Sequence, residues 1–493
     1  VIICNGFKDQ EYIETALLSQ KLGRNTIIVV DRKEELPLII TAAKKFNARP
    51  KIGFRAKLST QGAGKWVDSS GARSKFGLTA VEIVEGVELL RKEGMLDCLE
   101  LLHYHIGSQV PNISSIKSSL KEGARFYTEL YKMGAGLKYI DVGGGLGVDY
   151  DGSGKTDSSI NYSEQEYAND VVSTLQALCD EKGVPHPNIV TECGRALVAH
   201  HSVLVFNVMG KNELHRETPP RPAQKGDPNI LQDLQYIYEK VNKDNINECF
   251  NDLLVAKQET LQLFTYGVLS LEQRAWCESM YFTIATKMQE IARRTPDCED
   301  IQEKLADELC DTYFCNFSVF QSVPDSWAVG QLFPVMPIHR LNEEPSHSAT
   351  LADLTCDSDG KIEKFIDTEN GSYRKTMQVH GIEEGGEPYF MGIFLTGAYQ
   401  EILGDLHNLF GDTDAVHISL NEAGYTIDHY VPGDTVTEVL TYVQYGRTEM
   451  VDSVRQATEE SILRGTITKQ EAKLLIKHYE EGLSGYTYLE DPE

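Results

Sequence analysis

The first 212 residues alternate short apolar runs with amphipathic stretches, and this alternation limits the possible folds more than any other feature of the chain. Six runs read as strands: "VIIC" (1–4), "TIIVVD" (26–31), "KIGFRA" (51–56), "LELLHYHIG" (99–107), "KYIDVGG" (138–144) and "NIVTECG" (188–194). Strands that alternate with helices predict β-α units around a parallel sheet. A closed (β/α)8 barrel has eight units, so a barrel would hold about six of eight here and two would lie upstream of Val1. An open doubly wound sheet is the alternative.

The sequence changes character three times after this region. The predicted domains are the β/α barrel (1–212), a charged helical insertion (213–315), a β domain with alternating apolar residues (316–445) and a C-terminal helical segment (446–493). Helical periodicity in the second and fourth parts, and strand alternation with turn signals in the third, support this division. The expected fold class is therefore α/β, with a helical insertion and a β domain added to the barrel.

Charge and cysteine content exclude several functions. Asp plus Glu outnumber Lys plus Arg by 74 to 47, and the resulting formal charge of −27 opposes binding to nucleic acid or to anionic membranes. We find no apolar stretch long enough to cross a bilayer and no signal peptide. The 10 cysteines show no C-x-x-C pair, which predicts reduced thiols and a cytoplasmic protein.

The stretch "IDVGGGLG" (140–147) ends an apolar run in closely spaced glycines. Glycines at a strand end let main-chain N–H groups converge on a phosphate, although a tight strand-to-helix turn would use them as well. A dinucleotide fingerprint would need glycine at Val148, and a Walker loop would need its first glycine at Asp149. A bound phosphate would therefore belong to another cofactor.

Polar residues follow the predicted barrel strands at their carboxyl ends, where barrel enzymes carry their reactive groups. His105 and Ser108 follow one strand, and Glu192 and Arg195 follow another. Taken singly, the histidine could be structural and the Glu and Arg could form an ion pair. Together with the glycines they describe a site for an anionic aromatic cofactor, in which Glu192 faces a ring nitrogen and His105 stacks on the ring. Pyridoxal phosphate fits this description.

Longer motifs carry a resemblance to a known family. They are "KIGFRAKLSTQGAGKWVDSSGARSKFGL", "LLHYHIGSQ", "DVGGGLGVDYDGS", "TECGRA", "FSVFQSVPDSWAVGQLFPVMPIHRL", "LTCDSDGKI" and "GAYQEILGDLHNLFGDT". With these motifs the chain resembles the biosynthetic arginine decarboxylases, pyridoxal phosphate enzymes of the alanine racemase and ornithine decarboxylase type. "VMPIHRL" and the helical insertion favour the arginine branch.

The resemblance implies a role for each matching residue. It implies that the cofactor phosphate is held by Gly143, Gly144, Gly145, Ser108, Arg195 and Tyr399, that Glu192 pairs with the pyridine nitrogen and that His105 stacks on the ring. It further implies a homodimer or higher homo-oligomer with active sites at the subunit interface. A partner subunit would supply Cys356, as the acid that reprotonates the substrate carbon, and Asp357, as a substrate contact.

Asp325 of "SVPDSW" lies where related decarboxylases place a carboxylate against the distal cation of the substrate, here the arginine guanidinium. A turn-forming aspartate after proline is the alternative. The family also uses Mg²⁺, to which we assign no ligands in the sequence.

The implied reaction converts L-arginine to agmatine and carbon dioxide in polyamine biosynthesis, through an aldimine and a quinonoid. The family's Schiff-base lysine lies on the first barrel strand, and no residue of this chain matches it, so we expect an upstream piece of the same protein to complete the barrel. Without that lysine the chain alone should turn over poorly. The alternatives are decarboxylation of another basic amino acid or of a carboxylated polyamine, and a non-catalytic relative.

Overall fold

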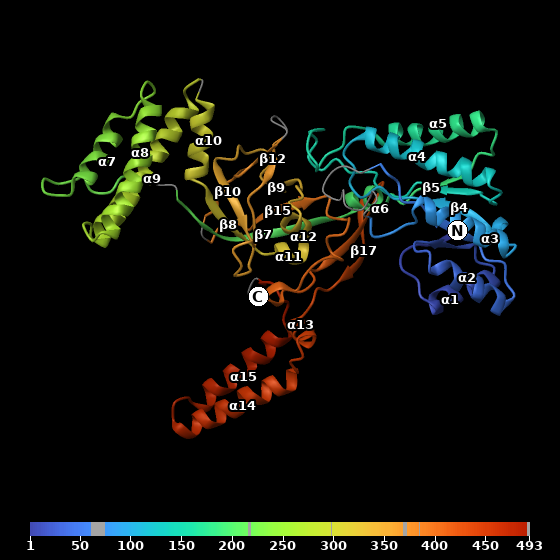
Figure 1. Ribbon diagram of the computed structural model, residues 1–493. Helices are drawn as coiled ribbons and strands as arrows, with labels where there is room; N and C mark the ends of the chain where they lie inside the picture. The colour runs from blue at the N-terminus through green and yellow to red at the C-terminus, as the bar shows by residue number, and fades with distance from the viewer. Residues whose placement is uncertain (61–73, 215–217, 297, 368–371, 384, 491–493) are drawn as a thin grey trace. The chain divides into compact units, whose positions relative to one another are not determined.

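A computed structural model describes residues 1–60, 74–214, 218–296, 298–367, 372–383 and 385–490 (Figure 1). The chain divides into two compact units. The first unit comprises Val1–Ser202, Asp367–Ser372 and Gly397–Tyr399, and the second comprises Val203–Ile366, Tyr373–Thr396 and Gln400–Glu493.

A six-stranded parallel sheet forms the centre of the first unit. Its strands are β1 (Ile2–Cys4), β2 (Thr26–Val30), β3 (Ile52–Arg55), β4 (Leu99–His103), β5 (Tyr139–Asp141) and β6 (Asn188–Val190). They are hydrogen-bonded in the order β1-β2-β3-β4-β5-β6, so each strand lies beside its neighbour in the sequence. A doubly wound sheet would reverse its strand order, whereas consecutive order is that of a β/α barrel. The barrel-type prediction is confirmed as a half-barrel, and the doubly wound alternative is wrong.

Strand β2 is apolar and buried on both faces, as strands of parallel sheets generally are. In β2, Ile28 and Val30 belong to the large core cluster that includes helix residues, while Ile27 and Val29 pack with Leu101 in a separate cluster. The helices of the unit are α1 (Gln10–Lys21), α2 (Glu35–Phe46), α3 (Ala80–Lys92), α4 (Ile113–Lys132), α5 (Glu164–Lys182) and α6 (Gly194–Val198), with 3-10 helices η2 (Leu96–Cys98) and η3 (Ala199–His201).

Helix starts in the first unit follow the capping signals of the sequence. Thr79 and Glu82 form a reciprocal capping box at α3. At α5 the Ser163 side chain accepts the Glu166 N–H, so Ser163 acts as an N-cap there.

A mixed sheet forms the centre of the second unit. It contains β7 (Val203–Asn212), β8 (Asp311–Cys315), β9 (Val335–Pro337), β10 (His347–Ala352), β11 (Lys361–Ile362), β14 (Met377–Val379) and β15 (Tyr389–Phe394). The strand order is β11-β10-β8-β7-β15-β9, with β14 on β10, and β8 runs parallel to β10. Residues 203–212, which the sequence analysis grouped with the barrel, form β7 and pair with β8 and β15. Short strands β12 (Phe365–Asp367) and β13 (Ser372–Arg374) form a separate pair.

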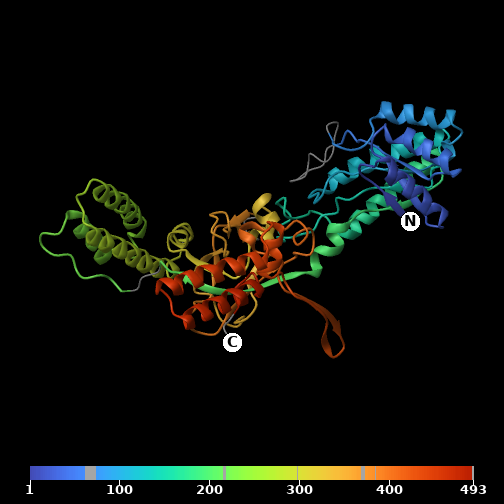
Figure 2. The same cartoon turned by 90° about the horizontal axis from the view of Figure 1, so that it is seen from below.

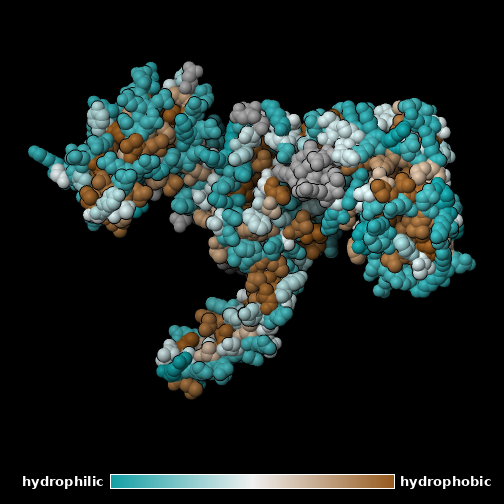
Figure 3. Space-filling view, viewed as in Figure 1, coloured by the Kyte–Doolittle hydropathy of each residue, from teal (hydrophilic) through white to brown (hydrophobic). Residues whose placement is uncertain are grey.

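The helical insertion has a core of its own. Helices α7 (Asn229–Lys240), α8 (Ile246–Thr265), α9 (Leu271–Arg293) and α10 (Glu299–Glu308) bury Leu231, Leu253, Ile284 and Met288 among other residues. Hydrophilic residues predominate on the face of these helices drawn in Figure 3. This amphipathic arrangement is the one that the helical periodicity predicts.

The remaining elements lie in the second unit. They are α11 (Val319–Ser322), α12 (Pro324–Ala328), the 3-10 helix η4 (His407–Leu409), the strands β16 (Ala415–Asn421) and β17 (Gly424–Val431), and the helices α13 (Val436–Tyr442), α14 (Arg447–Arg464) and α15 (Lys469–Ser484). None of the described helices is both long and apolar enough to cross a membrane.

Candidate active site

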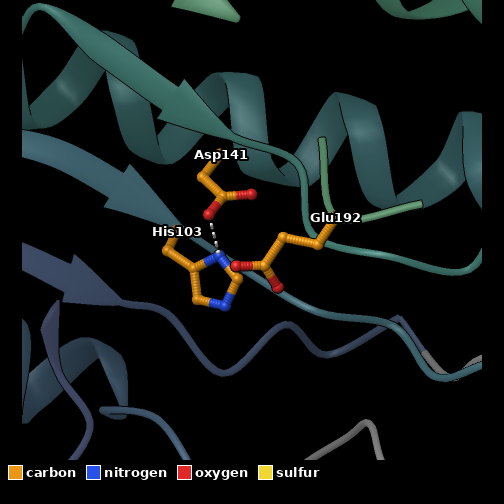
Figure 4. Close-up of side chains that lie close together, drawn as sticks. All are labelled: His103, Asp141 and Glu192. Atoms are coloured by element: carbon orange, nitrogen blue, oxygen red, sulfur yellow. Dashed lines mark ion pairs between the residues drawn. The ribbon is translucent and has the colours of Figure 1, made fainter. Parts of the chain in front are cut away.

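Polar side chains converge at the carboxyl ends of β4, β5 and β6 (Figure 4). His103 ends β4, Asp141 ends β5, and Glu192 follows β6; His103 Nδ1 lies 3.0 Å from Asp141 Oδ2. Asn5, directly after β1, donates its side-chain N–H to Glu192 Oε1 over 2.6 Å. Sequence reasoning selected Glu192 and missed His103, Asp141 and Asn5. The signal that selected Glu192, a polar residue at the end of an apolar strand, would also have selected these three residues.

Burial shifts the pKa values of Glu192 and His105. Burial raises the pKa of Glu192 above its usual value, and Asp141 adds to the rise while His103 opposes it. Burial also lowers the pKa of His105 to about 4, with Arg55 contributing in the same direction. The His105 imidazole is therefore neutral at pH 7, and its Nδ1 accepts the Gly107 N–H over 3.0 Å. The site thus combines a neutral imidazole with a carboxyl group whose pKa is raised by burial.

The glycine turn after β5 approaches other main chain very closely. Gly143 has φ +69°, and a Cβ there would lie 2.2 Å from the Tyr104 carbonyl oxygen; Gly145 has φ +110°. The Gly143 N–H donates to Asp141 Oδ1 over 2.9 Å. Among the described residues, the N–H groups of Gly144 and Gly145 form no hydrogen bond. The turn therefore needs its glycines for packing, and two of its amides are available to a ligand.

Arg195, on α6, gathers the other predicted phosphate contacts. Its side chain is buried, and Nε donates to Ser108 Oγ over 3.2 Å. Its NH1 nitrogen donates to Tyr150 OH over 3.0 Å, and its guanidinium carbon lies 4.6 Å from the centre of the Tyr399 ring. Tyr399 has φ +72°, an uncommon conformation for a non-glycine residue that tends to occur at functional sites. Ser108, Arg195 and Tyr399 thus lie together, and Tyr150 is a neighbour that the sequence analysis did not select.

Asp325 lies in the second unit on α12, where its side chain is buried. Its Oδ2 accepts the Gln400 side-chain N–H over 2.8 Å, and its own backbone N–H donates to Gln400 Oε1 over 3.1 Å. The carboxylate is thus hydrogen-bonded to a residue 75 positions away in the sequence. A turn-forming aspartate bonds to its own nearby backbone, so a turn alone does not explain the hydrogen bonds between Asp325 and Gln400.

Cys356 and Asp357 also lie in the second unit, in the exposed segment after β10. The Cys356 N–H donates to Asn408 Oδ1 over 3.2 Å, and Cys356 Sγ lies 3.6 Å from the same oxygen. Asp357 Oδ2 lies 3.3 Å from His407 Nε2. The motif "GDLHNLF" therefore positions the "TCD" motif, and His407 and Asn408 are residues that sequence reasoning missed although it quoted their motif.

Two groups of side chains in the described residues could ligate a cation. One is His103, Asp141 and Glu192, and the other is Glu213, Asp311 and His347 in the second unit. Each contains a histidine, whereas Mg²⁺ prefers oxygen ligands throughout. Neither group is therefore a good match for magnesium.

Comparison with known proteins identifies the parts of the chain. Residues 1–199 match the model "Pyridoxal-dependent decarboxylase, pyridoxal binding domain", residues 224–310 match "Arginine decarboxylase helical bundle domain", and residues 436–489 match "Arginine decarboxylase C-terminal helical extension".

Curated relatives match along nearly the whole chain. The biosynthetic arginine decarboxylase of Phocaeicola vulgatus is 48% identical over 492 residues, which cover 99% of this chain and 78% of that protein. The biosynthetic arginine decarboxylase of Gloeobacter violaceus is 51% identical, with 99% and 76% covered. These alignments give no support to the expected segment upstream of Val1, which stays a prediction.

Solved structures agree with the sequence matches. The crystal structure of the biosynthetic arginine decarboxylase from Campylobacter jejuni superposes with a TM-score of 0.84 at 33% identity and covers 100% of this chain and 78% of that one. Diaminopimelate decarboxylase from Helicobacter pylori, at 15% identity and a TM-score of 0.54, with 90% of this chain and 78% of that one covered, shares the fold. From the length and identity of these matches, the chain belongs to the family of the biosynthetic arginine decarboxylases, which are pyridoxal phosphate-dependent enzymes.

Proposed function

We propose that this protein decarboxylates L-arginine to agmatine and carbon dioxide, as a step of polyamine biosynthesis, with pyridoxal phosphate bound at the carboxyl ends of β4, β5 and β6. One observation carries the proposal: groups suited to both ends of this cofactor lie in the unit that matches the pyridoxal-binding family model. The names of the curated relatives support arginine as the substrate.

Glu192 and His105 suit the ring end of the cofactor. Burial raises the pKa of Glu192, and a protonated pyridine nitrogen would give its carboxylate a cationic N–H partner. The hydrogen bond from Asn5 fixes the orientation of the Glu192 carboxylate. A neutral imidazole stacks on the ring without repelling that positive charge. Bound pyridoxal phosphate supplies an electron sink for the electron pair that remains when a carboxylate leaves as carbon dioxide.

Arg195, Ser108, Tyr399 and the glycine turn suit the phosphate end. A buried guanidinium, a hydroxyl group and two unengaged amides form a donor set for a dianion. Gly143, whose N–H is engaged by Asp141, shapes the turn. In this proposal, therefore, the amides of Gly144 and Gly145 act with Arg195, Ser108 and Tyr399.

The substrate is handled by residues of the second unit. The Asp325 carboxylate, oriented by Gln400, accepts N–H groups of the arginine guanidinium. Cys356, in a partner subunit, donates the Sγ proton to the carbon that has lost its carboxylate, and Asp357 contacts the substrate. The exposure of both residues supports their contribution across a subunit interface, and so a homodimer at least.

Three further parts of the proposal concern the whole protein. The domain division is barrel, helical insertion, β domain and C-terminal helical segment, and the family matches to residues 224–310 and 436–489 support the second and fourth parts. All 10 cysteines are free thiols, which supports a cytoplasmic location. We assign no Mg²⁺ ligands, and Mg²⁺ is added to the activity assay described next because the resemblance implies that the family uses it.

The test is release of labelled carbon dioxide from carboxyl-labelled L-arginine by the purified protein with pyridoxal phosphate, with agmatine identified by mass spectrometry. Lysine, ornithine and a carboxylated polyamine are assayed in parallel. We expect arginine to be preferred and Glu192→Gln to lower kcat by a factor of 10 or more. Preference for another substrate would refute the arginine assignment. Absence of turnover with all four, in a preparation in which a lysine is shown to carry the cofactor, would refute the enzymatic function.

The lysine that anchors the cofactor needs a separate measurement. Among the described lysines only Lys8 is buried, and its ammonium group pairs with Asp31 and Glu35 at 3.3 and 3.1 Å. Borohydride reduction with pyridoxal phosphate, followed by peptide mapping, identifies the labelled lysine. We expect no label on Lys8, because its buried side chain is already engaged by the carboxylates of Asp31 and Glu35. A labelled Lys8 would contradict this.

A further inference from the structure

The strands β16 and β17 form an isolated two-stranded antiparallel hairpin, seen as a projecting ribbon in Figure 2. Its register pairs Val416 with Tyr430, Ile418 with Ile427 and Leu420 with Tyr425, with an irregularity between His417 and Ile418. Neither strand pairs with any other described strand. Each therefore has a free edge.

One face of this hairpin carries only aliphatic and tyrosine side chains. Because side chains alternate between the faces of a strand, the three pairs share one face, while His417, His429, Ser419, Thr426 and Asn421 lie on the other. The exposed fractions on the apolar face are 50% for Val416, 56% for Ile418, 87% for Leu420, 68% for Tyr425, 60% for Ile427 and 51% for Tyr430. This alternation is typical of a sheet with one face against a core, but here that face is uncovered.

An uncovered hairpin of this kind needs a partner. A two-stranded hairpin alone is at best marginally stable in water, and its free edges invite pairing with another strand. The six exposed side chains leave roughly 700 Å² of mostly apolar surface, close to the ~800 Å² that each partner contributes to an interface of standard size.

We propose that the apolar face of the β16–β17 hairpin packs against the same face of a second copy of this chain. Two copies with a formal charge of −27 each repel one another, so a contact between them is favoured where both surfaces lack charge, and none of the six residues is ionised at neutral pH. The pattern is also symmetric. The Ile418–Ile427 pair lies at the centre, and on each side of it an aliphatic residue faces a tyrosine.

This symmetry fits a two-fold contact. An isologous interface brings the same patch of both subunits together, and a rotation through the central isoleucine pair sets the aliphatic residues of one copy against the tyrosines of the other. The hairpin residues differ from those of the cofactor site and from Cys356 and Asp357, so loss of the hairpin contact alone would leave the catalytic proposal standing, whereas a monomeric wild type would contradict both.

The test compares the mass of the wild-type chain with that of Ile418→Asp by sedimentation velocity over a range of concentrations. The matched control is His417→Asp, which adds the same charge to the opposite face of the same strand. We expect Ile418→Asp to halve the wild-type mass, or to raise the dissociation constant at least 100-fold, and His417→Asp to keep the wild-type mass. Circular dichroism checks folding, and Leu420→Asp replaces the first variant if it does not fold.

Hydrogen exchange of residues 415–431 provides a second readout. In the wild type we expect protection at concentrations where the oligomer persists, lost on dilution and in Ile418→Asp. A wild-type chain that is monomeric at all concentrations would overturn the proposal. So would an Ile418→Asp variant of wild-type mass, or a hairpin that stays unprotected within the oligomer, since each means that another surface, or another partner, is involved.

Discussion

Replacing His105 with glutamine should reduce the amount of unfolding free energy that the first unit loses as the pH falls. The folded unit holds the His105 imidazole neutral, because burial lowers its pKa from 6.5 to about 4. Between these two values the unfolded chain binds a proton that the folded chain does not. The free energy of unfolding therefore falls as the pH drops from about 6.5 toward 4. Glutamine can still accept the Gly107 N–H but has no titrating group.

The size of the effect follows from the two pKa values. Relative to neutral pH, the single site destabilises the folded state by about 1 kcal/mol at pH 5.5 and about 2 kcal/mol at pH 4.5. The wild type should lose these amounts in addition to what His105→Gln loses over the same range. The difference between the two proteins isolates the contribution of His105 from other titrating groups.

The measurement is urea-dependent hydrogen exchange of peptides that cover β4 and β5, without added pyridoxal phosphate, from pH 7.5 to pH 4.5. This readout reports the first unit alone, which a global probe of a two-unit chain would not. His186→Gln, which removes an exposed imidazole, is the control and should follow the wild type. Equal pH dependence in the wild type and His105→Gln would refute the claim that burial keeps this ring neutral.

Three further changes test the site. Gly143→Ala should lower the stability of the first unit by about 3 kcal/mol and weaken cofactor binding, because its Cβ would overlap the Tyr104 carbonyl. The control Gly152→Ala has a similar φ but open space around its Cβ, and should cost only about 1 kcal/mol. Thermal unfolding and cofactor titration measure the two losses, and equal losses would contradict this prediction. Asp325→Asn should raise KM for arginine by about 10- to 100-fold with a smaller change in kcat, and unchanged kinetics would remove Asp325 from the substrate site. Cys356→Ala should lower kcat by about 10²- to 10⁴-fold without loss of stability, since the thiol is exposed, and an active variant would assign the proton to another donor.

Local sequence patterns predicted the elements of the first unit well, because strands such as β2 and β4 are buried apolar runs and helices such as α3 and α5 begin at capping residues. The strand order did not follow from these patterns alone, because consecutive β-α units also fit a doubly wound sheet; the order β1-β2-β3-β4-β5-β6 in the structure decides for the barrel type. The helical insertion was equally predictable, because amphipathic periodicity is a local property. By contrast, β7 follows the last barrel element without a break, and only its pairing with β8 and β15 assigns it to the second sheet.

The candidate site was only partly predictable for a similar reason. Glu192 and Arg195 were selected from residues that close strands, but Asn5, which closes the first strand, contacts Glu192 from 187 positions away. Asn408 and His407 support Cys356 and Asp357 from about 50 positions away. Such contacts depend on how elements pack, and no spacing rule within one segment reveals them.

The Asp141 carboxylate connects two parts of the candidate site. One of its carboxylate oxygens accepts the N–H at the start of the glycine turn, and the other touches the histidine beside Glu192. A single carboxylate thus contacts both the glycine turn and the histidine, so these two parts of the site share one side chain. For the cofactor site proposed above, we therefore expect a cofactor without its phosphate group to leave both parts less ordered than the complete cofactor does.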